Sequence, residues 1–204
     1  MLTEKDVSIF LNNVKHDKCI SKELIRIKDY SKDLYEHSIK VGIVSAILGS
    51  YMDVDAYEVF LCGLFHDYGK VLIDKRILEK PGKLTGKERG IMMQHPFLGY
   101  VELMQLNIFS EQVLLGVLDH HERVDGNGYS LGKKGNEISE FGKIVSVADV
   151  YCAMRYARPY RPWGIPTDEI KEELSHNSEK CFDPLIVKRF AMINLKMADE
   201  INNG

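Results

Sequence analysis

The fold of this chain is best predicted from the segment Val59-Phe60-Leu61-Cys62-Gly63-Leu64-Phe65-His66-Asp67-Tyr68-Gly69-Lys70. Its first seven residues are almost entirely apolar, which indicates a buried helix that starts near Asp55. Because glycine is the usual helix terminator, this helix must end near Gly69. His66 and Asp67 are therefore expected in its last turn, beside apolar side chains that would bury them.

Helical periodicity continues on both sides of this segment. Helices are expected over residues 4–14, 21–29, 32–51, 55–65, 113–121 and 138–154, and after Thr167 and Asp183-Pro184. Another helix starts at Thr85, which forms a capping box with Glu88, and His95 is expected to close it. Since no segment shows the period-two alternation of a half-buried strand, the sequence predicts an all-α helical bundle.

Composition favours one globular domain without a strongly charged partner. The 204 residues are 45% apolar and 28% charged, and 27 basic side chains stand against 30 acidic ones. This slightly negative balance gives no general attraction to DNA or to an acidic membrane, so phosphate recognition must be local. We divide the chain into an N-terminal helical segment, 1–29, and a main domain, 30–204.

The four cysteines indicate a reducing compartment. They are far apart, form no C-x-x-C pair and follow no secretory segment, so we expect free thiols and a cytoplasmic protein: Cys19, Cys62, Cys152 and Cys181. No apolar stretch approaches the ~20 residues that span a bilayer.

Histidines and carboxylates supply the candidate chemistry. The residues in distinctive contexts are His37, His66, Asp67, His95, His120, His121 and Asp149. A buried carboxylate without a partner costs several kcal/mol, and a metal ion would relieve that cost at Asp67. Imidazole and carboxylate without thiolate suit Fe, Mn, Zn or Co. Two such cations about 3.5–4 Å apart activate water and bind phosphate oxygens, which is the chemistry of phosphoester hydrolysis.

Four further residues extend this site. Asp33 stands one helical turn before His37 and shares its face, so it is either an additional ligand or an ordinary surface aspartate. Lys70, three residues after Asp67, either places a positive charge near a phosphate or is solvated. Arg158 and Arg161 either bind phosphate oxygens or belong to a surface turn.

The ordered set of motifs resembles the HD-GYP family of bacterial cyclic di-GMP phosphodiesterases. The matching motifs, within residues 30–195, are His66-Asp67-Tyr68-Gly69-Lys70, His95-Pro96, His120-His121-Glu122-Arg123-Val124-Asp125-Gly126-Asn127-Gly128-Tyr129, Asp149-Val150-Tyr151 and Arg158-Pro159-Tyr160-Arg161. Several motifs in the right order are far more specific than a lone His-Asp pair.

The resemblance implies an HD-type fold with two or three Fe or Mn ions that converts cyclic di-GMP to linear pGpG, and in some members to GMP. It also implies roles for individual residues. The metal ligands would be His37, His66, Asp67, His95, His120, His121 and Asp149, with Asp67 bridging and Asp33 at the position of a third-metal ligand. Asp67 and Lys70 would be catalytic, and Lys70, Tyr129, Arg158 and Arg161 would bind the substrate.

Two departures leave alternatives open. Ser130 stands where the signature has proline. Family members usually read Asp-Ala-Leu-Thr-Ser-Asp before the Arg-Pro-Tyr-Arg motif, whereas this chain has Cys152-Ala153-Met154-Arg155-Tyr156-Ala157 there. The alternatives are a phosphodiesterase that prefers cyclic GMP-AMP, a non-catalytic module that binds cyclic di-GMP or a diguanylate cyclase, and a generic HD nucleotidase. Few residues precede the motifs, so we expect regulation to come from a separate protein or from metal supply.

Overall fold

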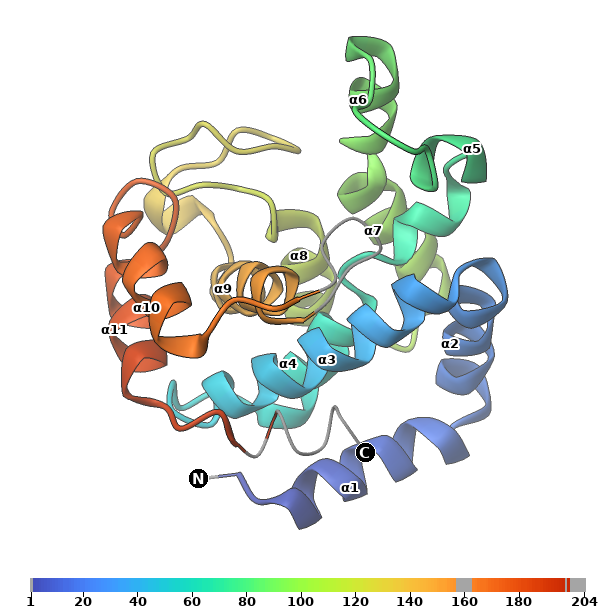
Figure 1. Cartoon of the computed structure of the whole chain (residues 1–204). Coiled ribbons are helices and arrows are strands. Elements are labelled where there is room, and N and C mark those ends of the chain that lie inside the picture. Colours follow the sequence, from blue (N-terminus) through green and yellow to red (C-terminus); the bar gives the residue numbers. More distant parts are fainter. Residues whose placement is uncertain (1, 157–162, 197, 199–204) are drawn as a thin grey trace.

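The protein is all-α, as predicted, in a computed structural model that describes residues 2–156, 163–196 and 198 (Figure 1). The described ranges contain no strand, only an isolated bridge between Ser178 and Phe182. The elements are α1 (Glu4–His16), α2 (Lys18–Tyr30), α3 (Lys32–Gly49), α4 (Ala56–Phe65), η1 (Tyr68–Leu72), α5 (Lys75–Leu78), α6 (Gly86–Met92), α7 (His95–Leu106), α8 (Glu111–Asp119), η2 (Gly135–Glu137), α9 (Glu140–Arg155), α10 (Thr167–His176) and α11 (Pro184–Met192).

Helix α3 forms the centre of the bundle and packs against α4 and α9 (Figure 1). Its residues 41–49 are buried throughout. Glycine at position 63 lets α3 and α4 approach closely, since a Cβ atom there would lie only 2.9 Å from Gly42 Cα and Val41 O. This close approach brings the C-terminal end of α4, which carries His66, against α3.

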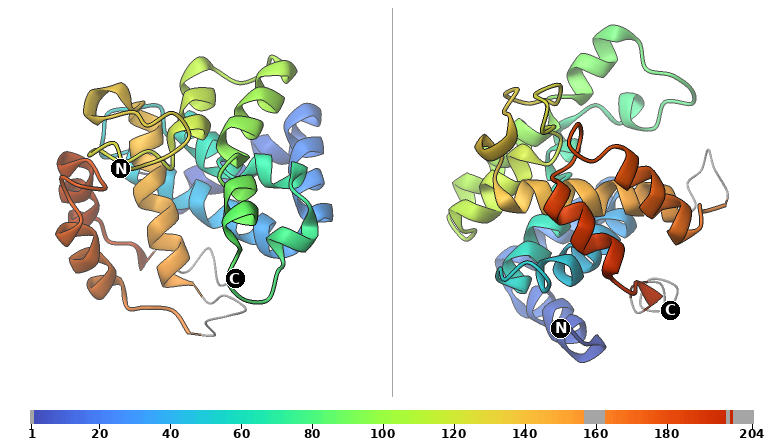
Figure 2. Two further views of the ribbon diagram at one scale, coloured as in Figure 1. Left: turned by 90° about the horizontal axis from the view of Figure 1, so that it is seen from above. Right: turned by 90° about the vertical axis from the view of Figure 1, so that its left-hand side faces the viewer.

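The N-terminal helices belong to the same packed core. Val7 and Val14 of α1 and Ile20 and Ile27 of α2 join the buried cluster formed around α3. At the other end of the chain, α10 and α11 pack on each other and on α9, and α6 projects from the body (Figure 2). The proposed division at residue 29 stays a prediction.

One expected helix end is wrong. The capping box at Thr85 does start a helix, but α6 already ends at Met92, and His95 begins α7 instead of closing α6. The physical reason is Pro96: proline is favoured in the first turn of a helix, where its missing N–H is not needed.

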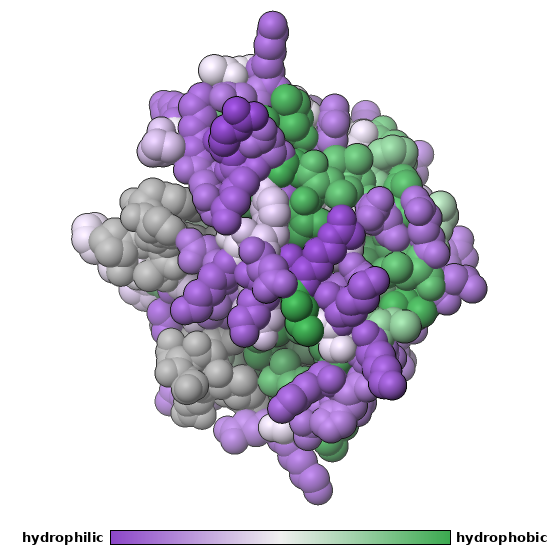
Figure 3. Space-filling view, turned by 90° about the vertical axis from the view of Figure 1, so that its right-hand side faces the viewer, coloured by the Kyte–Doolittle hydropathy of each residue, from purple (hydrophilic) through white to green (hydrophobic). Residues whose placement is uncertain are grey.

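The side of the molecule with α2, α5 and α6 shows apolar patches among polar side chains (Figure 3). Large apolar residues exposed in these elements include Ile25 and Ile91. Among the described residues, no helix has the length and apolar character needed to cross a membrane.

Candidate metal centre

Helix ends bring the candidate ligands together. His37 lies in the second turn of α3, His66 caps the end of α4, His95 begins α7, His120 caps the end of α8 and Asp149 lies within α9. The ligand atoms form two groups in which all lie within 4.8 Å of one another: Asp67, His95, His120 and His121 in one, and His37, His66 and Asp149 in the other. The structure thus brings seven predicted ligands to one place.

The Asp67 carboxylate lies between the two groups. Its Oδ1 is 3.0 Å from His95 Nε2, and its Oδ2 is 3.2 Å from His66 Nε2. In the second group, His37 Nε2 lies 2.9 Å from Asp149 Oδ1. The Asp67 carboxylate therefore has one oxygen toward each donor group.

Backbone carbonyls orient three of the imidazoles. The Nδ1 atoms of His66, His95 and His120 lie 2.7, 2.8 and 2.7 Å from Gly63 O, Met92 O and Val117 O, respectively. Because a carbonyl only accepts, each Nδ1 carries a proton, and in a neutral ring Nε2 then presents a lone pair to the site. This is the orientation that metal-binding histidines need.

The unpaired polar atoms at the centre fit a cation. His95 Nε2 and His120 Nε2 are only 3.2 Å apart, although both rings already donate through Nδ1. His66 Nε2 and Asp67 Oδ1 are buried and meet no hydrogen-bond partner in suitable geometry. Buried polar atoms are normally paired, so this donor set is explained best by divalent metal ions.

The lowered pKa values of three histidines agree with metal binding at neutral pH, because the neutral imidazole is the form that binds a cation. Burial disfavours the charged imidazole and lowers the pKa of His95, His120 and His121, that of His121 to about 3. Burial also opposes charge on His66, but Asp67 and Asp149 outweigh it and raise its pKa. Against the effect of burial, His66 and Lys70 hold the pKa of Asp67 well below its usual range.

The remaining predicted residues lie at the edge of the centre or outside the described ranges. Lys70 Nζ is 2.6 Å from Asp67 Oδ2, so its charge lies against the carboxylate between the two donor groups. Asp33 is exposed and belongs to neither donor group, and its role as a ligand stays a prediction. Arg158 and Arg161 lie outside the described residues.

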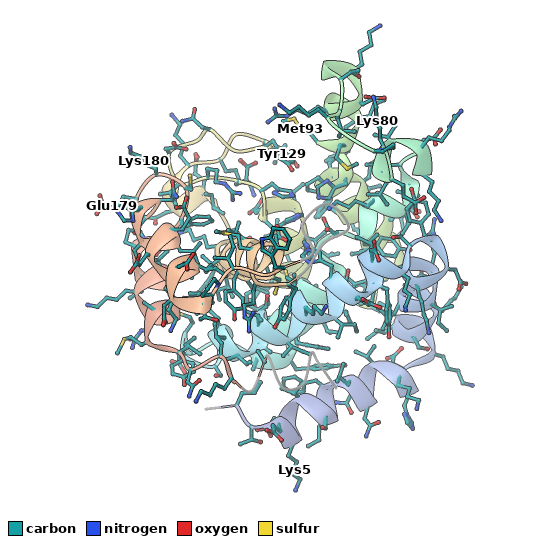
Figure 4. All side chains as sticks on the ribbon, in the orientation of Figure 1. Lys5, Lys80, Met93, Tyr129, Glu179 and Lys180 are labelled. Atoms are coloured by element: carbon teal, nitrogen blue, oxygen red, sulfur yellow. The ribbon has the colours of Figure 1, made fainter. Side chains whose placement is uncertain are left out.

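Tyr129 closes one side of the site. Its ring stacks on His121 with centroids 4.6 Å apart and planes at 25°, and its N–H donates to His121 O at 3.1 Å. Figure 4 shows Tyr129 on the loop that follows α8, on the side facing α6.

Two acidic residues near the histidine pair received no role from the sequence. Asp119 is fully buried, and its carboxylate accepts hydrogen bonds from Lys133 Nζ at 2.7 Å and Ser139 N at 2.9 Å. Glu122 is 2% exposed and accepts three backbone N–H bonds from residues 131–133. The sequence offered two weak signals for them: Asp119 lies at the end of an apolar helix, and Glu122 directly follows His120-His121 in the motif.

Comparisons with known proteins give the same picture. A family model described as HD domain matches residues 27–186. A cyclic di-GMP phosphodiesterase of Thermotoga maritima is 36% identical over 185 residues, covering 87% of this chain and 50% of that protein. A 3′3′-cGAMP-specific phosphodiesterase of Vibrio cholerae is 40% identical over 130 residues, covering 60% of this chain and 24% of that protein. The chain spans half or less of the length of these relatives.

Among solved structures, a cyclic GMP-AMP specific phosphodiesterase of V. cholerae superimposes with a TM-score of 0.62 over 89% of this chain and 50% of that one. The two are 18% identical, so this likeness concerns the fold alone.

Proposed function

Because this chain belongs to the HD domain family, in its HD-GYP branch, we propose that it is a metal-dependent phosphodiesterase that hydrolyses cyclic di-GMP to linear pGpG. Product analysis decides whether a second cleavage to GMP follows. The carboxylate of Asp67, with one oxygen toward each donor group, is the observation that carries this proposal. Seven ligands in two adjacent groups suit two cations, and Fe or Mn fits their imidazole and carboxylate atoms.

Divalent cations held by these ligands would activate water and stabilise the charge that develops on the phosphate during attack on phosphorus. The chain's own residues orient this reaction. Asp67 lies between the two donor groups and contacts a histidine of each. The imidazoles of His66, His95 and His120, bound to carbonyls through Nδ1, keep their Nε2 atoms directed into the site. Lys70, next to Asp67, contributes a positive charge for a non-bridging phosphate oxygen.

The parts of the substrate beyond the scissile phosphate need other residues. We assign Arg158 and Arg161 to the phosphates, because guanidinium groups bind phosphate oxygens through two parallel hydrogen bonds. Tyr129 offers an aromatic face at the edge of the site, and nucleobases stack on such faces. A third cation, with Asp33 as a ligand, would need this exposed side chain to turn toward the centre.

The test is turnover by purified protein loaded anaerobically with Fe(II) or Mn(II). We expect cyclic di-GMP to disappear and pGpG to accumulate. Chromatography of the products measures this, and the metal content is determined on the same sample. Intact cyclic di-GMP, under conditions in which a known phosphodiesterase cleaves it, would refute the proposal. Tight binding without turnover by metal-replete protein would indicate a binding module instead, and preferential turnover of dNTPs or nucleoside monophosphates a generic nucleotidase.

A second candidate substrate is cyclic GMP-AMP. It is favoured by the V. cholerae relative whose name gives that specificity. The departure Arg155-Tyr156 at the end of α9 adds a second reason, because it changes the chain just before Arg158 and Arg161; Lys40 Nζ lies 4.8 Å from the ring centroid of the buried Tyr156. Turnover of the two cyclic dinucleotides by the same sample decides between them.

A further inference from the structure

The loop that presents Tyr129 is held by a buried carboxylate. Glu122 Oε1 accepts hydrogen bonds from Leu131 N at 2.6 Å and Gly132 N at 3.1 Å, and Oε2 accepts one from Lys133 N at 3.1 Å. Three backbone donors on one carboxylate leave the loop residues 131–133 little freedom. Glu122 directly follows His121, so one short segment carries both the metal ligand and the holder of the loop.

A second tie holds the same loop from below. Lys133 Nζ forms an ion pair with the buried Asp119 at 2.7 Å, and Asp119 also accepts from Ser139 N. The loop is packed so closely on the chain behind the histidine pair that a Cβ atom at Gly128 would lie 2.4 Å from Arg123 N. The path of the chain on both sides of Tyr129 is therefore set by contacts with residues 119–123.

These contacts decide where the Tyr129 ring lies. The ring stacks on His121 and faces the side of α6 (Figure 4), and its backbone, bonded to His121 O through the Tyr129 N–H, leads directly into residues 131–133. A loop released from Glu122 would leave His66, His95 and His120 in place, because their Nδ1 atoms are anchored on backbone carbonyls of residues 63, 92 and 117. The hydrogen bonds that orient these three imidazoles are therefore different from those that hold residues 131–133.

We propose that Glu122 is a positioning residue for substrate specificity: by clasping residues 131–133 it fixes Tyr129 over His121 and so sets the affinity of the site for a cyclic dinucleotide. This inference rests on the proposed function. It assigns to Glu122 no contact with the metal or with the reacting atoms. Small phosphodiesters that need only the metal centre are therefore insensitive to the clasp, whereas a large cyclic substrate depends on it.

The test is Glu122→Gln in the metal-loaded chain. Glutamine keeps the shape of the side chain but places an NH2 donor where one carboxylate oxygen accepted a backbone N–H, so at least one of the three bonds is lost. We expect KM for cyclic di-GMP to rise roughly tenfold, as the loss of a charge-assisted hydrogen bond implies. Metal content and turnover of bis(p-nitrophenyl) phosphate should stay within about twofold of wild type by the same reasoning, because those bonds do not hold the ligands.

The matched control is Glu137→Gln. Glu137 is exposed and accepts a backbone N–H from Lys134 at 2.8 Å in the same loop, but it does not reach residues 131–133. We expect KM to be unchanged in this variant. Tyr129→Ala should reproduce the rise in KM, and the double variant with Glu122→Gln should add nothing further.

Several outcomes would overturn the inference. An unchanged KM in Glu122→Gln would do so, and so would an equal loss of turnover on both substrates with loss of metal, which would make Glu122 a support of the metal centre. If the wild-type chain binds cyclic di-GMP without cleaving it, the proposed function fails. The positioning role of Glu122 is then tested by comparing the dissociation constants of the same variants for cyclic di-GMP. If wild type neither binds nor cleaves cyclic di-GMP, both fail together.

Discussion

Asp67 and Lys70 are three residues apart and in contact, yet they should fail in different ways. Asp67→Ala removes a carboxylate that reaches both donor groups, and His66→Ala removes a candidate ligand, so we expect both variants to lose metal and activity. Lys70→Ala should retain metal and lose turnover by about a hundredfold, the usual effect of removing a group that stabilises transition-state charge. Metal analysis and turnover on the same anaerobic preparations measure both effects. A Lys70→Ala protein without metal would contradict the role given to the lysine.

Ser130 presents a different problem at the residue scale, because its Oγ is buried without a hydrogen-bond partner among the described residues. An unsatisfied buried hydroxyl costs about 1–3 kcal/mol, so Ser130→Ala should stabilise the protein, by about 1 kcal/mol. This corresponds to a rise in Tm of roughly 2–4 °C for a chain of this size.

A suitable comparison is Ser110→Ala. The Ser110 hydroxyl accepts from Val113 N and donates to Glu58 at 2.7 Å, so its removal should cost roughly 1 kcal/mol. If thermal unfolding showed the same loss in both variants, the Ser130 hydroxyl would have a partner, such as an ordered water.

Between elements, α2 is tied to η1 through Tyr68. The Tyr68 hydroxyl accepts from Arg26 at 2.8 Å and donates to the buried Glu23, and Tyr68 immediately follows Asp67. Tyr68→Phe removes both bonds, and we expect a loss of about 2 kcal/mol in the free energy of unfolding. Denaturant titration measures it. Tyr57→Phe is the control, since its hydroxyl has no hydrogen bond within the described residues. Equal stability in the two variants would show that the link contributes nothing.

Most of the helices follow from local signals in the sequence, but α5 and α7 were not predicted, and neither were some contacts between elements. The periodic helices and the capping box at Thr85 were predicted within a few residues, because both depend on neighbours along the chain. The wrong assignment of His95 came from reading Pro96 as a stop when it begins a helix. Glu122 could not be assigned a role, because its partners are backbone N–H groups nine to eleven residues away, placed by the path of a loop.

At the scale of the whole molecule, the candidate metal centre joins elements that are far apart in the sequence. His37 of α3 and Asp149 of α9 are 112 residues apart in the sequence, yet His37 Nε2 lies 2.9 Å from Asp149 Oδ1. The end of α8 likewise contacts the start of α7, through His120 and His95. Without metal, this junction holds several buried imidazoles in their neutral form. The unfolded chain has no such constraint, so the global stability of metal-free protein must depend on pH.

The sign follows from the direction of each pKa. His95, His120 and His121 have lowered pKa values, so below pH 6.5 the unfolded chain binds more protons at these residues and the metal-free fold loses stability as pH falls. Each contributes at most about 1.4 kcal/mol per pH unit. The raised pKa of His66 has the opposite effect on stability and offsets part of this loss. The lowered pKa of Asp67 affects stability only near and below pH 3.8.

We therefore expect the Tm of chelator-treated protein to fall between pH 7 and pH 5, and His121→Gln to show a shallower dependence because one of the three lowered groups is gone. His16→Gln, at an exposed histidine, should follow wild type. Metal-loaded protein should be the more stable form throughout, with the difference shrinking at low pH as protons compete for the ligands. Stability of the chelator-treated protein that stayed level or rose toward pH 5 would mean that the histidines are not held neutral by burial, and the electrostatic description of the whole centre would have to change.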